Sequence, residues 1–315
     1  MPSPQSHLVS FALRRLVKAR AHNQVDIGTV RAWVNTLMGL HFLSGTGVTI
    51  RDFTDSGLRG EWLTPPGEPG GRVLLYLHGG GYFFCSPRTH RPVTVNLCRR
   101  ARAYTLALRY RLAPEHPFPA ALEDAVGAYL WLLDMGYHPA QIGLAGDSAG
   151  GGLALATLVY LRDSGLPLPA AAVCFSPWTD LAGTGRSLDA NDEMCAMFSA
   201  QAIRRGAQIY LAGADPRSPL VSPLYADLRG LPPLLLHVSD SEVLLDDSTR
   251  LAEKAREAGV PTRLKVWPRQ PHVWQLFAPV LPEGRQSLQE AAEFLCAHLR
   301  AGSAWEGLQP GYCFP

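Results

Sequence analysis

Gly146-Asp147-Ser148-Ala149-Gly150 spells the pattern G-x-S-x-G, and this stretch decides the fold. The apolar residues 142–145 before it are typical of a buried strand, and residues 151–160 after it are typical of a helix. A serine on such a tight strand-to-helix turn has a strained backbone, with its hydroxyl projecting from the sheet edge. Only small neighbours avoid clashes there, and the quoted stretch supplies them. It therefore predicts a nucleophile elbow with Ser148 as the nucleophile.

Strand-like and helix-like segments alternate on both sides of this elbow. Short β-branched and aliphatic runs are followed by longer runs of helical period, which is typical of βαβ units and a mostly parallel sheet. The expected inner strands are 73–77, 104–109, 142–146, 171–175, 234–238 and 262–267, and the expected helices are 93–102, 120–135, 148–162, 244–258 and 284–299.

Two regions lie outside this alternation, and both have the apolar spacing of helices. We assign residues 1–45 and 181–221 to a helical cap, which packs on the core and also covers a substrate pocket. The core then consists of residues 46–180 and 222–302. Residues 303–315 have no periodicity and are expected to be a loosely held tail.

The composition favours a globular protein without a nucleic-acid or membrane partner. Of the 315 residues 47% are hydrophobic and 18% are charged, which allows a large core and excludes general disorder. The formal net charge is only +2, and the basic cluster at 99–102 is explained by the end of a helix. Charges interrupt the N-terminal apolar residues, and no apolar run is long enough to cross a membrane. We expect a cytoplasmic location.

The six cysteines are spread singly along the chain, without C-x-x-C pairs. This pattern is not typical of zinc sites or of a disulfide scaffold. We therefore expect a reducing compartment, no metal and no cofactor.

A glycine triplet follows the expected strand 73–77, in the run His78-Gly79-Gly80-Gly81. Glycine lets the backbone pass close to a ligand and present N–H groups to it. A phosphate loop is a poor alternative, because the run is not followed by the Lys and Ser/Thr of a Walker motif and does not match G-x-G-x-x-G. We expect Gly79 and Gly80 to donate to an oxyanion, joined by the Ala149 N–H at a helix N-terminus.

A serine hydroxyl needs a neighbouring base, and histidine is the usual one near neutral pH. Among ten histidines, only His272 lies in a loop just after the expected last strand, where the base of such a fold belongs. The acid that orients the base then lies between Ser148 and His272 in the sequence.

Four carboxylates compete for the role of this acid, all after the strand 234–238. Asp246 and Asp247 fall in the first turn of the next helix, where the helix dipole alone explains them. Asp240 and Glu242 both lie in the loop, and composition alone does not separate them.

Five motifs in this order resemble those of the hormone-sensitive-lipase-like esterases, the bacterial family IV carboxylesterases. The similarity runs over about residues 60–299 and implies an α/β-hydrolase fold. In such a fold a mostly parallel eight-stranded central sheet has helices on both faces and a helical cap. The motifs are His78-Gly79-Gly80-Gly81, Tyr110-Arg111-Leu112-Ala113-Pro114-Glu115, Gly146-Asp147-Ser148-Ala149-Gly150-Gly151, Ser176-Pro177-Trp178-Thr179-Asp180 and Pro271-His272-Val273-Trp274.

The resemblance also implies roles for residues that spacing alone leaves open. The acid of such esterases begins a pattern similar to D-P-L-x-D, which residues 242–246 fit with Glu in place of Asp. Glu242 is therefore the first choice and Asp240 the runner-up. His78, Gly81 and Asp147 would be structural supports of the glycine loop and the elbow.

The implied activity is hydrolysis of small esters with short acyl chains, through an acyl-enzyme. Cys85 departs from the family pattern, where glycine is common, and a larger side chain there would narrow the pocket or shift the loop. The sequence does not distinguish an esterase from an amidase or deacetylase with the same triad. A non-catalytic receptor of the same fold is disfavoured because His272 is present. The strand 262–267 would lie at a sheet edge, which favours a homodimer through that strand.

Overall fold

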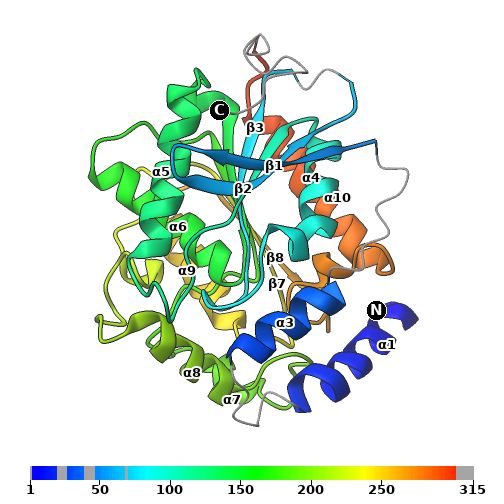
Figure 1. Cartoon of the computed structure of the whole chain (residues 1–315). Helices are drawn as coiled ribbons and strands as arrows, with labels where there is room; N and C mark the ends of the chain where they lie inside the picture. The colour runs from blue at the N-terminus through cyan, green and yellow to red at the C-terminus, as the bar shows by residue number, and fades with distance from the viewer. Residues whose placement is uncertain (1, 20–26, 39–46, 68–69, 303–315) are drawn as a thin grey trace.

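The central element is an eight-stranded sheet with the order β1-β2-β4-β3-β5-β6-β7-β8 (Figure 1). The structure, a computed structural model, describes residues 2–19, 27–38, 47–67 and 70–302. Pairs β1/β2 and β2/β4 are antiparallel, and all other neighbours are parallel. This confirms the mostly parallel sheet. The strands are β1 (Thr49–Asp55), β2 (Leu58–Thr64), β3 (Val73–Leu77), β4 (Tyr104–Leu108), β5 (Ile142–Asp147), β6 (Ala171–Phe175), β7 (Leu234–Ser239) and β8 (Thr262–Trp267).

Helices cover both faces of the sheet, as a buried parallel sheet requires. One face packs against α4 (Arg91–Ala101) and α10 (Pro282–His298). The other face packs against α5 (Ala120–Asp134), α6 (Ala149–Asp163) and α9 (Leu245–Glu257) (Figure 1). Successive residues of β3 alternate between the two cores, because successive strand side chains point to opposite faces.

The expected inner strands begin and end within one residue of the observed strands, and the expected helices within two residues. Apolar runs predict these elements well because β3, β5, β6 and β7 are buried along their whole length. Short 3-10 turns complete the core at η2 (Pro87–His90), η3 (Pro139–Gln141), η4 (Pro223–Tyr225) and η5 (Trp274–Phe277).

The segments that we assign to a cap lie together at one end of the sheet (Figure 1). They are α1 (Pro4–Leu13), the π-helical turn η1 (Arg14–Lys18), α3 (Ile27–Met38), α7 (Ser187–Ala190) and α8 (Ala200–Leu211). The Arg14 guanidinium donates to the Glu193 and Met194 carbonyl oxygens at 2.7 and 2.5 Å, which joins the two segments.

Parts of the predicted organisation fall outside the described residues, namely the tail 303–315 and residues 1, 20–26 and 39–46 of the N-terminal cap region. The division into cap and core stays a prediction. In the described part of the chain, no helix has both the length and the apolar character that a membrane span requires.

Candidate active site

Ser148 lies at the junction of β5 and α6 with a strained backbone. Its φ of 51° and ψ of −121° are a conformation that residues with a side chain rarely adopt. The turn needs glycine on both sides. A Cβ on Gly146 would lie 2.3 Å from the Gly150 carbonyl oxygen, and one on Gly150 would lie 2.0 Å from the Leu77 oxygen. The Ser148 N–H donates to the Phe175 oxygen at 2.8 Å, which holds the elbow against the end of β6.

The predicted base and the first-choice acid are in direct contact. His272 Nδ1 lies 2.5 Å from Glu242 Oε2, and both side chains are buried. Glu242 Oε1 accepts a hydrogen bond from the Ser176 hydroxyl at 2.7 Å and from the Ser239 N–H at 2.8 Å. A buried carboxylate with three partners is fixed in one orientation, and it fixes the imidazole in turn.

The second ring nitrogen of His272 differs from Nδ1 in its contacts. Its Nε2 is buried and forms no hydrogen bond with any described residue, Ser148 included. The Phe198 ring packs edge-on against the imidazole, with the centroids 5.3 Å apart. Ser148 is brought to the same region through β6, because Phe175 binds its N–H and the next residue, Ser176, binds Glu242.

The other three carboxylates of this region have different partners. Asp240 is exposed and accepts a hydrogen bond from the Arg269 N–H at 2.6 Å. Asp246 accepts from the Ser187 N–H at 3.1 Å. Asp247 is buried in the first turn of α9 and accepts from the N–H groups of residues 179 and 180, and burial raises its pKa to about 8. Of the four carboxylates, Glu242 is the one that contacts His272.

The first glycine of the triplet is bound to the elbow. The Gly79 N–H donates to Asp147 Oδ1 at 3.0 Å, and a Cβ on Gly79 would lie 2.2 Å from Asp147 Oδ2. The Gly79 N–H is thus engaged by the elbow, and the prediction that Gly79 donates to an oxyanion stays a prediction. The N–H groups of Gly80, Gly81 and Ala149 form no hydrogen bond to another described residue.

Asp147 is the centre of a buried network below the elbow. Its carboxylate also accepts from the Tyr76 hydroxyl at 2.6 Å and lies 3.1 Å from His90 Nε2. Burial by itself would raise the pKa of Asp147, but His90 and the Tyr76 hydroxyl stabilise the carboxylate, so its pKa lies below the ordinary value. The contacts suit the predicted supporting role, because they tie the elbow to the glycine loop.

His78 supports the same loop from the other side. Its Nδ1 lies 2.8 Å from the Gly79 carbonyl oxygen, and its ring stacks on Tyr110 with centroids 4.3 Å apart. Burial lowers the pKa of His78 to about 3, so the ring is neutral near pH 7. Since a carbonyl oxygen only accepts, Nδ1 carries the proton and donates it.

Sequence reasoning missed two supporting residues, Ser176 and His90. Ser176 had a usable signal, because it follows β6 and β6 neighbours the strand that carries Ser148. His90 lies in η2 beyond the quoted motifs and had no such signal.

Cys85, the departure from the family pattern, packs behind the glycine loop. Its φ is 69°, and a Cβ on Gly80 would lie 2.9 Å from the Cys85 Cβ. It lines an open groove of about 580 Å³ together with Arg31, Ser86, Arg88, Arg109, Leu112, Glu115 and His116.

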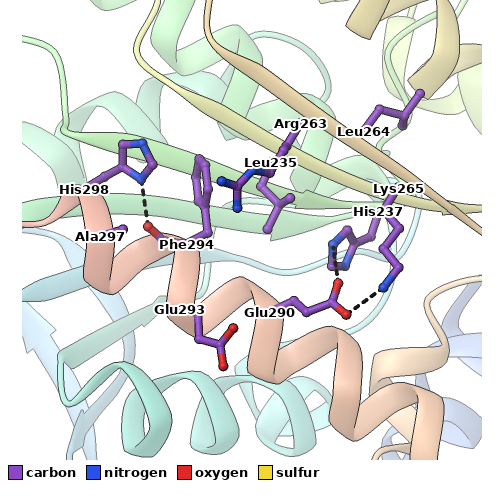
Figure 2. A pocket seen from close by; sticks show the side chains of 10 residues that line it. All are labelled: Leu235, His237, Arg263, Leu264, Lys265, Glu290, Glu293, Phe294, Ala297 and His298. Atoms are coloured by element: carbon purple, nitrogen blue, oxygen red, sulfur yellow. Dashed lines mark hydrogen bonds and ion pairs between the residues drawn. The ribbon is translucent and has the colours of Figure 1, made fainter.

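A second cavity, of about 270 Å³, lies between β7, β8 and α10 (Figure 2). Figure 2 shows Lys265 and His237 directed toward Glu290; Lys265 Nζ lies 2.6 Å from Glu290 Oε1, and His237 Nε2 lies 3.8 Å from Glu290 Oε2. The lining contains none of the predicted site residues, so this cavity is separate from the candidate site.

Known proteins resemble this chain in sequence and in structure. Residues 74–276 match the α/β hydrolase fold family. An acetyl-hydrolase of Streptomyces hygroscopicus is 52% identical over 235 residues, covering 75% of this chain and 78% of that protein. An esterase of Acinetobacter venetianus is 37% identical over 248 residues, covering 78% and 82%. The crystal structure of an esterase from the bacterial hormone-sensitive lipase family superimposes with a TM-score of 0.90 and 45% identity, covering 95% of this chain and 100% of that one.

Proposed function

The chain belongs to the α/β-hydrolase family and, within it, to the hormone-sensitive-lipase-like esterases, and on that premise we propose a triad of Ser148, His272 and Glu242 acting on short-chain esters. The protein is a serine carboxylesterase. One observation carries the assignment of the triad. A buried carboxylate holds the His272 ring by Nδ1 and leaves Nε2 without a partner among the described residues.

The reaction runs in two halves through an acyl-enzyme. Ser148 Oγ attacks the ester carbonyl carbon while His272 Nε2 accepts the hydroxyl proton. The tetrahedral intermediate collapses, and Nε2–H protonates the departing alcohol. Water then attacks the acyl-serine with Nε2 as base, and the carboxylic acid is released. Catalytic hydrogen bonds often tighten only when substrate binds, so the missing Ser148–His272 bond is compatible with this sequence.

We assign oxyanion stabilisation to the N–H groups of Gly80, Gly81 and Ala149, with Gly81 in place of Gly79. A trans peptide directs its C=O and N–H in opposite directions. His78 binds the Gly79 oxygen, which turns the Gly80 N–H away from His78. The Ala149 N–H belongs to the first turn of α6, where no intrahelical acceptor is available and the dipole favours negative charge.

Hydrolysis of p-nitrophenyl esters from two to sixteen carbons tests the proposal. A pocket of limited volume should give a maximum of kcat/KM at roughly two to eight carbons. An organophosphate should label Ser148 in the wild type and not in Ser148→Ala, as read by peptide mass spectrometry. Absence of both hydrolysis and label would contradict the triad. Faster turnover of matched p-nitroanilides would favour the amidase alternative.

We also propose that two copies pair through β8. This strand ends the sheet, and Val266 on it is 43% exposed. Unpaired edge strands are usually covered or paired with another chain. Sedimentation equilibrium should give a dimer mass for the wild type and a monomer for Val266→Lys. A monomeric wild type would overturn this proposal without affecting the triad.

A further inference from the structure

Arg31, on the cap helix α3, holds two loops of the core at once. Its Nε donates to the Phe83 carbonyl oxygen at 2.8 Å, and its Nη2 donates to the Ala113 oxygen at 2.8 Å. Both Nη atoms also bind the Glu115 carboxylate, at 2.7 and 2.8 Å. The planar guanidinium suits such a set, because its donors leave in fixed directions.

The Phe83 end of this contact leads directly to the glycine loop. The N–H groups of Phe83 and Phe84 both donate to the Gly80 carbonyl oxygen at 3.0 Å. That carbonyl shares one planar peptide with the Gly81 N–H, which points the opposite way. The turn has no spare room, since a Cβ on Gly80 would lie 2.2 Å from the Phe84 oxygen. A shift of the Phe83–Phe84 segment would therefore rotate the Gly81 N–H.

The Ala113 end braces the same loop from its other side. The Ala113 N–H donates to the Tyr82 carbonyl oxygen at 2.9 Å, and the Tyr110 hydroxyl donates to the His78 oxygen at 2.6 Å. Arg31 thus closes a ring of hydrogen bonds that runs around the glycine loop.

We propose that Arg31 is a positioning residue that fixes the Gly81 N–H toward the oxyanion and so couples docking of the cap helix to the rate of ester cleavage. The proposal rests on the proposed function. The Arg31 side chain is 26% exposed and that of Glu115 is 55% exposed, so their ion pair alone adds little stability. Arg31 instead acts by holding the Phe83 and Ala113 carbonyl oxygens in fixed directions. Its bond to Glu115 lowers the pKa of that carboxyl to about 2.

Arg31→Ala tests this, with Arg204→Ala as a matched control. Arg204 lies on the cap helix α8 and binds the Asp189 carboxylate at 2.7 and 2.9 Å, so its side chain is paired within the cap segment 181–221. Loss of one oxyanion donor costs roughly 10² to 10³ in kcat, so a misdirected donor should cost about 10- to 100-fold. We expect this loss in kcat for Arg31→Ala, with KM within about threefold, and near wild-type constants for Arg204→Ala.

Inhibition by a trifluoromethyl ketone distinguishes a misdirected Gly81 N–H from a general loosening of the active site. Its adduct with the serine carries an oxyanion, so its Ki should rise by the same factor by which kcat/KM falls. An unreactive alcohol analogue of the ester should bind equally well to wild type and variant. An unchanged ketone Ki, a loss confined to KM, or an equal loss in Arg204→Ala would overturn the proposal.

If Arg31→Ala does not fold, two conservative variants test the same proposal. Arg31→Lys keeps the charge but loses the planar set of donors. Its kcat should lie below that of the wild type and above the value expected for Arg31→Ala. Glu115→Gln leaves both backbone contacts of Arg31 in place, so its kcat should fall less than that of Arg31→Lys. Equal activity of wild type and Arg31→Lys would count against positioning. A wild type that cleaves no ester would instead refute the proposed function.

Discussion

Among the residues that the structure describes, two buried pairs of a histidine and a carboxylate lie near the elbow. His272 Nδ1 lies 2.5 Å from Glu242, and His90 Nε2 lies 3.1 Å from Asp147. All four side chains are almost fully buried. Each carboxylate also accepts one hydroxyl and one backbone N–H. The environments of the two acids are therefore alike.

The pairs differ at the other nitrogen of each ring. His90 Nδ1 lies 2.9 Å from the Thr89 hydroxyl, so both of its nitrogens are engaged in structure. His272 Nε2 has no partner among the described residues. A histidine held by a carboxylate is thus not by itself a base, and we propose that the histidine whose second nitrogen has no hydrogen-bond partner is the one that transfers a proton.

Replacing each histidine by alanine is the strongest test of this difference. His272→Ala removes the proton acceptor and should lower kcat by roughly 10⁴- to 10⁶-fold, because a triad acts as a unit. His90→Ala should retain turnover within about 100-fold of wild type. Initial rates on p-nitrophenyl butyrate, with circular dichroism to verify folding, measure both. Equal losses would remove the distinction between the two pairs.

The two acids of the 240–242 loop give the next largest effect. Glu242→Gln keeps the shape but no longer selects the tautomer that leaves Nε2 free, and it should lower kcat by roughly 10⁴-fold. Asp240→Asn, at the exposed position two residues away, is the matched control and should stay within about twofold. Full activity in Glu242→Gln, measured at saturating ester, would contradict the triad.

Asp147→Asn tests the His90–Asp147 pair, and we expect its main effect on the free energy of unfolding. Removing one partner of a buried pair costs about 3 kcal/mol of unfolding free energy or more. Activity should fall by only about 10- to 100-fold, through loosening of the Gly79 contact. Urea unfolding and steady-state rates measure the two quantities separately. Unchanged stability combined with a 10⁴-fold loss of kcat would place Asp147 in the reaction itself.

The sequence predicts the strands and the elbow because these depend on local apolar runs and on small residues. It does not predict which backbone N–H groups already donate to an acceptor within the protein. Gly79 and Gly80 are equivalent by composition, and what separates them is the bond of Gly79 to Asp147, 68 residues away. Asp240 and Glu242 likewise differ by burial, which the fold alone decides. Long-range partners set these roles, so local patterns leave them open.

The smallest expected effect concerns two further buried histidines, His78 and His237. Burial lowers the pKa of each to about 3, whereas an unfolded histidine titrates near 6.5. Between these values the unfolded chain binds protons at these two positions that the folded chain does not, so their contribution to stability falls as the pH drops below 6.5. From pH 7 to 5 each histidine should cost about 2 kcal/mol.

His78→Gln and His237→Gln test whether this acid sensitivity is shared by the glycine loop and the distant cavity. Urea unfolding at pH 7, 6 and 5 should give a steeper decline for the wild type than for either variant, because each variant lacks one histidine that is protonated only in the unfolded chain. His78 lies beside the proposed oxyanion donors, so its variant should also lower kcat. His237 lines the separate cavity, so its variant should change the pH slope alone. Identical slopes in all three proteins would mean that neither ring stays neutral in the fold.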